Sequence, residues 1–206
     1  MLLYLFSGPG GRSDGFAAWA KEWGRGAGVK VVVDELDIIN GSTADLCDDS
    51  TWGSWIKRIR EGEYHAVLMS PPCSTFSRAR RNDELESGPS ALRGPEGRDL
   101  YGLAGLRPEL LDKVKIGTLL GERAAEAAKS CSMHQPPIPW LLENPEIIPG
   151  DPSLFNLDNV KGLLVHPGVF DQSFPQCNVG CLGLKYTRLR GTVHLGIATT
   201  CEHEKQ

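Results

Sequence analysis

Short apolar runs alternate with segments of helical periodicity through the first two thirds of the chain. The runs at 2–6, 29–36, 66–70 and 140–142 predict β-strands. Apolar side chains at helical spacing predict helices over 13–26, from 49–51 to about 61, and over 109–131. Strands that alternate with helices imply right-handed crossovers. The pattern therefore predicts an α/β fold with a mainly parallel sheet.

The pattern changes beyond Pro145, where proline and glycine become frequent and the apolar segments shorten. We expect irregular structure and antiparallel strands there, including one near 185–193. Residues 79–108 are rich in glycine, proline and mixed charge. A loop of that length inside a compact domain is typically functional or disordered. A lid over an active site and a solvated surface excursion both fit this segment.

The size of the chain, 206 residues with 40% hydrophobic content, predicts one domain over 1–206. Its core spans 1–145, and an irregular C-terminal part spans 146–206. A net charge of −4 argues against binding nucleic acid through bulk electrostatics, so any such contact needs a local basic patch. No apolar run approaches the roughly 20 residues that cross a bilayer. We expect a cytoplasmic protein with no membrane partner, whose six cysteines form no disulfides.

Cys73 stands on a proline-stiffened turn directly after the apolar run at 66–70. Pro71 and Pro72 fix φ and disfavour helix before them. The thiol is therefore expected at the carboxyl edge of the sheet, where open α/β folds bind their ligands. Taken alone, the turn fits a presented nucleophile and an inert thiol equally well.

A second apolar strand, 140–142, delivers Glu143 and Asn144 to another proline turn at Pro145. In a parallel sheet both turns lie on the same edge, so Cys73 and Glu143 are expected to face one pocket. A carboxyl group at the end of a buried strand is desolvated, which raises its pKa and suits it to donate or share a proton. The alternative is that Glu143 forms a salt bridge with an arginine.

Glycines separate the first strand from the first helix, and such a turn lets the backbone approach a ligand closely. The candidate ligand-binding residues of this turn are Phe6, Ser7, Gly8, Gly10 and Gly11. A carboxylate after the second strand typically binds ribose hydroxyls, and Asp34, Glu35 and Asp37 compete for that role, with Glu35 and Asp37 preferred. Asp45 could accept from an adenine amino group, or cap local backbone.

Together these residues resemble the DNA (cytosine-5)-methyltransferase family, which uses S-adenosyl-L-methionine. Three segments match the family's motifs in chain order: Leu5-Phe6-Ser7-Gly8-Pro9-Gly10-Gly11 with Gly15-Phe16, Pro71-Pro72-Cys73 with Phe76-Ser77, and Glu143-Asn144. The chain looks closer to small relatives carried by phages or mobile elements. Those relatives share its Gly88-Pro89…Leu92-Arg93 and Gln176-Cys177…Lys185…Thr187 segments.

The resemblance implies a Rossmann-like methyltransferase fold with helices on both faces of the sheet. It implies that Cys73, Glu143 and Asn144 are catalytic. The Cys73 thiolate would add to carbon 6 of cytosine and Glu143 would protonate or hydrogen-bond ring nitrogen 3, so that carbon 5 takes the methyl group. The target base must be flipped out of a duplex or already unpaired.

Cofactor and nucleic-acid contacts follow from the same resemblance. S-adenosyl-L-methionine would be held by Phe6, Ser7, Gly8, Gly10, Gly11, Glu35, Asp37, Asp45 and Pro71. DNA would be contacted by Ser77, Arg78, Arg80, Arg81, Lys185, Arg188 and Arg190. A solvated basic turn is the alternative for the first three arginines.

The chain departs from the family pattern in several places. Tyr4 replaces the usual acidic residue before the glycine motif, and Pro145 follows Asn144 where valine is common. A large target-recognition domain is missing, so sequence specificity is low or a partner protein supplies it. RNA or a free cytosine nucleotide is an alternative substrate, and a non-catalytic cofactor- or nucleic-acid-binding regulator is an alternative of another class.

The last part of the chain contains Cys177, Cys181, Cys201 and His203 in Cys-x3-Cys and Cys-x-His pairs. These four side chains could clip the tail with a tetrahedral zinc ion. The spacings are imperfect for such a site, so free thiols are the preferred interpretation and no metal is expected.

Overall fold

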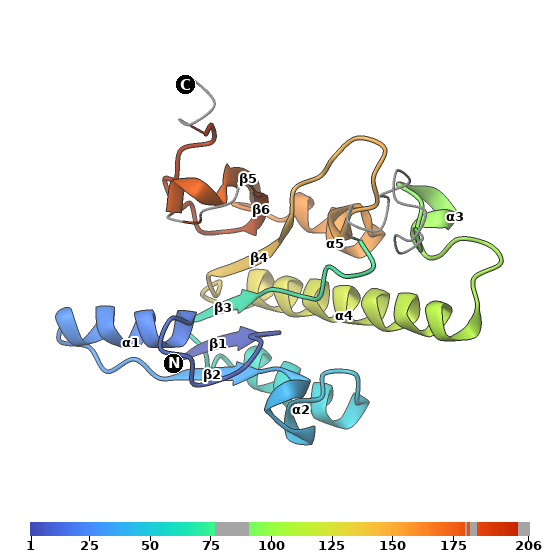
Figure 1. The fold of residues 1–206 in the computed structure, drawn as a ribbon. Helices are drawn as coiled ribbons and strands as arrows, with labels where there is room; N and C mark the ends of the chain where they lie inside the picture. The colour runs from blue at the N-terminus through green and yellow to red at the C-terminus, as the bar shows by residue number, and fades with distance from the viewer. Residues whose placement is uncertain (77–90, 180, 182–184, 202–206) are drawn as a thin grey trace.

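The computed structural model describes residues 1–76, 91–179, 181 and 185–201. A six-stranded sheet with the order β2-β1-β3-β4-β6-β5 runs through these described residues (Figure 1). Its strands are β1 (Leu2–Leu5), β2 (Val33–Leu36), β3 (Ala66–Met69), β4 (Trp140–Pro145), β5 (Phe170–Pro175) and β6 (Tyr186–Gly191). The four strands β2, β1, β3 and β4 are mutually parallel, and β6 runs antiparallel to both β4 and β5. The predicted α/β class and mainly parallel sheet are confirmed.

Three helices match the segments predicted at 13–26, 49–61 and 109–131, whereas a short helix at 97–100 lies in the expected loop at 79–108 and another at 158–162 was not predicted. The helices are α1 (Phe16–Gly26), α2 (Asp49–Arg60), α3 (Gly97–Leu100), α4 (Pro108–Met133) and α5 (Asp158–Gly162), with short 3-10 turns between several elements. The carboxylate of Asp48 accepts from the amide of Thr51 at 2.7 Å and so caps the start of α2. Pro108 begins α4, where its missing amide hydrogen costs nothing.

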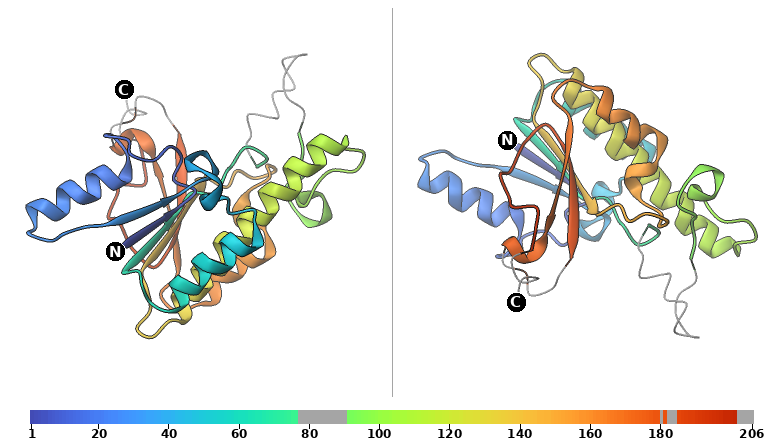
Figure 2. Two further views of the ribbon diagram at one scale, coloured as in Figure 1. Left: turned by 90° about the horizontal axis from the view of Figure 1, so that it is seen from below. Right: turned by 90° about the horizontal axis from the view of Figure 1, so that it is seen from above.

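The two faces of the sheet are covered unequally. One face presents buried side chains to a core shared with α2 and α4, and these include Leu3, Leu5, Val67, Met69, Trp140 and Leu142. On the opposite face, the ring of Tyr4 meets that of Phe16 in α1, with centroids 5.4 Å apart. Figure 2 shows α1 on one side of the sheet and α2, α4 and α5 on the other. Helices therefore lie on both sides, but most of the helical packing is on one.

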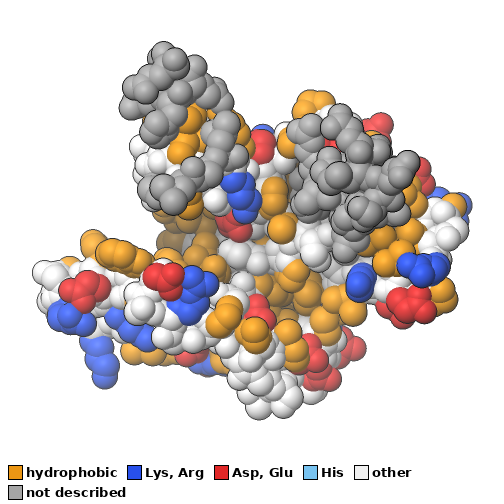
Figure 3. Space-filling model, in the orientation of Figure 1, with side chains coloured by type: hydrophobic (Ala, Val, Ile, Leu, Met, Phe, Trp, Pro, Cys, Tyr) orange, Lys and Arg blue, Asp and Glu red, His pale blue; other side chains and the backbone are white. Residues whose placement is uncertain are grey.

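The aromatic side of α1 is not buried. Trp19 and Trp23 are 67% and 73% exposed. Figure 3 shows hydrophobic side chains along this helix. Beside it, half-buried side chains of β1, β3 and β4 line an apolar cavity of about 170 Å³ that Phe16 helps to close. Helical spacing predicted the helix correctly, but spacing alone does not say what packs on it.

The strand order reverses between β1 and β3, because β2 lies on one side of β1 and β3 on the other. In open α/β sheets, ligands bind in the crevice at the carboxyl ends of the strands where the order reverses. The segments that leave these two strand ends are the glycine turn at 6–11 and the turn that carries Cys73. Within the described residues, no helix has the length and apolar character that crossing a bilayer requires.

Candidate active site

The turn that carries Cys73 begins while the chain is still paired with β1. The amide of Ser70 donates to the carbonyl of Leu5 at 3.1 Å, and the amide of Phe76 donates back to the carbonyl of Cys73 at 2.8 Å. Cys73 is half-buried, whereas Phe76 is buried in the core. The thiol therefore sits on a closed turn at the sheet edge that is anchored by the side chain three residues later.

Asn144 ties the end of β4 to the same turn. Its side chain is 2% exposed, and its amide nitrogen donates to the carbonyl of Pro71 at 2.8 Å. Side chains alternate along a strand, so Asn144 and Glu143 point to opposite faces of the sheet. The structure thus brings the ends of two neighbouring strands together and gives Asn144 the task of holding the Cys73 turn.

Glu143 lies in a largely dry environment at the end of β4. Burial raises the pKa of its carboxyl group, and Lys185 and a hydrogen bond with Ser70 oppose that rise without cancelling it. Ser70 in turn accepts a hydrogen bond from the hydroxyl of Tyr4 at 3.3 Å. Among the described residues, the charge that acts on Glu143 comes from Lys185, and the hydroxyl groups of Ser70 and Tyr4 support its carboxyl group in a chain across the sheet.

The glycine turn after β1 is held by two side chains from the loop that follows β2. The carboxylate of Asp37 accepts from the amide of Gly8 at 3.0 Å, and the side chain of Asn40 accepts from the amide of Gly10 at 2.8 Å and donates to the carbonyl of Gly8 at 3.0 Å. Gly8 and Gly11 have φ of 69° and 71°, a region that favours glycine. Sequence reasoning missed Asn40, whose only signal is its place three residues after Asp37.

A cavity of about 430 Å³ opens at this strand-end edge. Its lining is mainly apolar with two carboxylates and comprises Phe6, Asp37, Ile38, Ala44, Asp45, Leu46, Cys47, Pro72, Ile116 and Leu120. Phe6 holds a φ of 60°, which is unusual for a residue with a large side chain and is a form of strain that clusters at ligand sites. The cavity joins three of the expected cofactor residues, Phe6, Asp37 and Asp45, and adds side chains from α4 that the sequence did not single out.

The acidic residues near the end of β2 have separate tasks. Asp34 accepts from the hydroxyl of Tyr64 at 2.8 Å and pairs with Arg58 at 3.2 Å. Glu35 stands opposite Tyr4 in the sheet and is not part of the cavity lining, whereas Asp37 is. Asp45 accepts from the amide of Cys47 at 2.8 Å, so it shapes its own loop while it lines the cavity.

Arg190 was expected to contact DNA, but the structure places it in the interior. It is 2% exposed, donates to both oxygens of Asp171 at 2.6 and 2.8 Å, and donates to the carbonyl of Val160 at 2.8 Å. Its guanidinium also lies over the ring of Phe155, 5.0 Å from the centroid. A side chain buried and engaged in this way does not reach a phosphate, so Arg190 belongs to the core.

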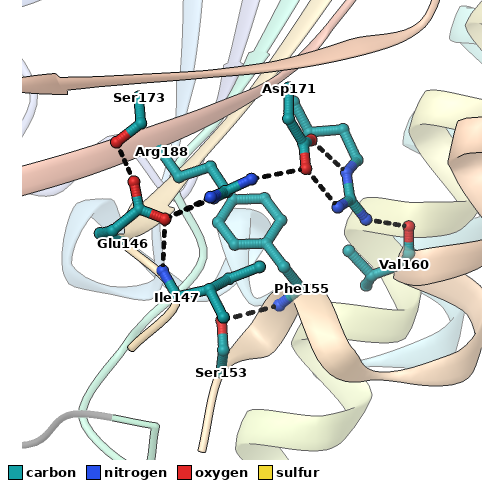
Figure 4. Close-up of polar contacts among 9 residues, drawn as sticks. Glu146, Ile147, Ser153, Phe155, Val160, Asp171, Ser173 and Arg188 are labelled. Carbon is teal, nitrogen blue, oxygen red and sulfur yellow. Dashed lines mark hydrogen bonds and ion pairs between the residues drawn. The ribbon is translucent and has the colours of Figure 1, made fainter. Parts of the chain in front are cut away.

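Arg188 belongs to the same network (Figure 4). It donates to Glu146 at 2.7 Å and to Asp171 at 2.8 Å, and Glu146 also accepts from Ser173 and from the amide of Ile147. Both of its carboxylate partners come from strands β4 and β5 or their ends. Arg188 therefore joins strands in the sheet, and an incoming phosphate would have to compete with two carboxylates.

The remaining expected contacts divide into two groups. Lys185 is exposed, and its charge partly opposes the rise in the pKa of the Glu143 carboxyl group. Ser77, Arg78, Arg80 and Arg81 lie outside the described residues, as does His203.

Among the cysteines of the possible zinc clip, Cys177 and Cys201 bring their sulfur atoms to 3.1 Å, and Cys181 is exposed. Over the described part of the chain, no group of three or more histidine, cysteine or acidic side chains is arranged to hold a metal ion.

Comparison of the sequence with protein-family models found no match, and comparison with curated proteins found none either. The function must therefore be argued from the site itself.

Proposed function

We propose that this protein is an S-adenosyl-L-methionine-dependent methyltransferase that acts on carbon 5 of cytosine in DNA. The observation that carries the proposal is the meeting of three features at one sheet edge. These are a nucleophile on an anchored turn, a carboxyl group whose pKa is raised by burial, and a mainly apolar cavity with two carboxylates. The hydrogen bond from Asn144 to Pro71 joins the Cys73 turn to the end of the strand that carries Glu143.

The cavity has the size and character that a nucleoside-containing cofactor requires. Small-molecule sites usually span roughly 300–1,000 Å³ and combine an apolar lining with a few polar groups. Leu46, Ile116 and Leu120 would pack on the adenosyl group, while Asp45 and Asp37 would accept hydrogen bonds from its polar edges. Pro72 belongs to the same lining, so the cofactor would lie directly beside the Cys73 turn. When bound, S-adenosyl-L-methionine supplies an electrophilic methyl group.

The chemistry follows from the two strand-end groups. Carbon 5 of cytosine is too weak a nucleophile to take a methyl group, so the sulfur of Cys73 adds to carbon 6 and makes carbon 5 electron-rich. Glu143 in its protonated form donates to ring nitrogen 3, where the electron pair of the opened double bond is delocalised. Once carbon 5 has taken the methyl group, loss of its proton, return of the proton on nitrogen 3 to Glu143 and departure of Cys73 as a thiolate would restore the ring.

The same chemistry on RNA or a free cytosine nucleotide is the second candidate. One observation favours the free nucleotide: Arg188 and Arg190, expected to bind backbone phosphates, are engaged with carboxylates. RNA has the same phosphate backbone as DNA, so this observation does not favour RNA over DNA. Among the described residues, Lys185 is then the remaining expected phosphate contact.

The test is transfer of labelled methyl from S-adenosyl-L-methionine to duplex DNA, single-stranded DNA, transfer RNA and cytidine nucleotides. Cys73→Ala should abolish incorporation, and Cys181→Ser, a change at an exposed thiol, should retain it. Label at carbon 5 of cytosine in one substrate class would support the proposal and choose the substrate. Cofactor binding without transfer to any of the four would favour a non-catalytic regulator, or a need for a specificity partner.

A further inference from the structure

Arg93 is fully buried, with 0% of its surface exposed. It donates to the carbonyl of Leu100 at 2.7 Å, the carbonyl of Val114 at 2.7 Å, the hydroxyl of Thr118 at 3.0 Å and, through Nε, the hydroxyl of Thr75 at 3.1 Å. Every one of these acceptors is a neutral oxygen. Burial lowers the pKa of Arg93 to about 10, so the side chain still carries its charge at neutral pH.

The guanidinium of Arg93 holds the last part of the Cys73 turn against α4. Besides its bond to Thr75, it lies over the ring of Phe76, 3.9 Å from the centroid. Gly117 in α4 makes room for this contact. A Cβ at that position would stand 2.6 Å from the hydroxyl of Thr75 and 3.1 Å from Nη2 of Arg93.

Within the described residues, the buried guanidinium of Arg93 is paired with neutral oxygens, which is an expensive way to fill a core. Apolar side chains of similar volume often stabilise a fold as well or better than buried charges do. What arginine adds is a rigid fork of donors that fixes several segments at defined angles. Here the fork joins the Cys73 turn to the helix that also supplies Ile116 and Leu120 to the cavity.

We propose that Arg93 is a positioning residue, which keeps the Cys73 turn aligned with the cofactor cavity through Thr75 and Phe76. The inference rests on the proposed function for its catalytic consequence, although the alignment itself can be tested without catalysis. Misplacement of a reacting group by about 1 Å can cost on the order of 100-fold in rate. Loss of this anchor should therefore lower kcat and leave cofactor affinity largely unchanged.

The experiment compares Arg93→Lys, Thr75→Val and Thr75→Ser with the wild type. Thr75→Val keeps the shape of the side chain and removes the acceptor for Arg93, whereas Thr75→Ser retains that acceptor. Arg190→Lys is the matched control. Arg190 is also buried, donates to a carbonyl and stacks on a phenyl ring, but its partners Val160 and Phe155 do not belong to the Cys73 turn. Thermal unfolding of each variant separates loss of alignment from loss of fold.

Two further readouts are measured at a temperature where every variant is folded. The first is the rate at which iodoacetamide alkylates Cys73, followed by peptide mass spectrometry with Cys131 and Cys181 as buried and exposed references. The second is the pair of constants kcat and cofactor Kd. For Thr75→Val and Arg93→Lys we expect Cys73 alkylation to rise at least ~3-fold as the turn opens locally. We expect kcat to fall ~10–100-fold, with Kd changed less than about twofold.

The outcomes separate this inference from the proposed function. If Thr75→Val leaves both Cys73 alkylation and kcat at wild-type values, or if Arg190→Lys alters both equally, Arg93 is an ordinary core residue and the inference is wrong. If the wild type transfers no methyl group but Thr75→Val still changes the alkylation rate of Cys73 and Thr75→Ser keeps the wild-type rate, the alignment stands and the proposed function fails.

Discussion

At the scale of single residues, the support of Glu143 decides how the site responds to pH. The hydroxyl of Tyr4 donates to Ser70, and the hydrogen bond between Ser70 and Glu143 favours the charged carboxylate. Burial acts in the opposite direction and dominates, so the pKa of Glu143 is raised. The proposed reaction needs the protonated form, and its activity should therefore fall as pH rises through that raised pKa.

Ser70→Ala should shift this alkaline limb to higher pH. The change removes a hydrogen bond that stabilises the carboxylate, so Glu143 keeps its proton to a higher pH. Loss of the bond should also lower the maximal kcat/KM by ~3–10-fold, because a net hydrogen bond is worth about 0.5–1.5 kcal/mol. The measurement is the pH profile of kcat/KM for the wild type, Ser70→Ala and Tyr4→Phe. Tyr4→Phe should move the limb in the same direction by less, and a limb that moves to lower pH in Ser70→Ala would contradict the assignment.

At the scale of elements, the network between β4, β5 and β6 stabilises the C-terminal half of the sheet. Burial opposes ionisation of Asp171, but hydrogen bonds and charges from Arg190 and Arg188 outweigh it and lower the pKa of its carboxyl group. Asp171 is thus bound to two cations, one of them buried. Removal of the carboxylate would leave the charge of Arg190 without its partner inside the core.

Asp171→Asn should lower the free energy of unfolding by about 3 kcal/mol at neutral pH. A carboxyl group whose pKa is lowered on folding contributes stability above its ordinary pKa of 3.8, and that stability is lost as pH falls through the lower folded value. The difference between wild type and variant should therefore narrow in acid. Urea unfolding at pH 7 and near pH 3 measures it, with Asp14→Asn as the control because the pair of Asp14 with Arg12 is exposed. Equal losses in both variants, or a difference that does not depend on pH, would rule out the network as the cause.

The loop after β2 carries a separate prediction, which concerns cofactor binding. Asn40→Ala removes the acceptor for the amide of Gly10 and the donor for the carbonyl of Gly8, so the glycine turn loses its hold on this loop. The Kd for S-adenosyl-L-methionine should rise by about tenfold, since two partly exposed hydrogen bonds contribute roughly 1–2 kcal/mol. Calorimetric titration measures this change. Asn178→Ala, which removes contacts to the carbonyls of Ala198 and Thr200 instead, should leave Kd unchanged.

These elements also show what the sequence could and could not predict. The strand ends with Cys73 and Glu143 were predictable, because apolar runs stop at prolines whose effect on the backbone is local. Antiparallel strands were expected beyond Pro145, and β6 confirms the one near 185–193. The place of β5 was not predicted, since Asp171, Gln172 and Ser173 give it no apolar alternation and its pairing with β6 is long-range. The burial of Arg190 was equally hidden, because it depends on Asp171 and Phe155, which lie far away in the sequence.

At the scale of the whole molecule, the parallel direction of β1, β2, β3 and β4 places the glycine turn, the loop after β2, the Cys73 turn and Glu143 at one edge of the sheet. Alternation of strands and helices predicted a parallel sheet. It did not predict the cavity, because Ile116 and Leu120 of α4 meet Phe6 and Asp45 only in the folded chain. The glycine turn, the loop after β2 and the Cys73 turn all border this space or are bonded to its lining. A ligand that fills the cavity would therefore contact several elements at once, and its binding should stabilise the whole fold.

S-adenosyl-L-methionine should raise the Tm of the whole protein. A ligand at 100 times its Kd adds about 2.7 kcal/mol to the folded state, which corresponds to ~5–10 °C for a chain of this size. Ile116→Trp should abolish the shift, because the larger side chain occupies the cavity, and its half-exposed position lets the fold accept the change. Cys73→Ala should keep the shift, since the thiol is not part of the cavity lining. Differential scanning fluorimetry with the three proteins is the measurement. A shift that survives in Ile116→Trp would show that the cofactor binds at another site, whereas a shift lost in Cys73→Ala would show that binding depends on contact with the thiol itself, which the cavity lining does not include.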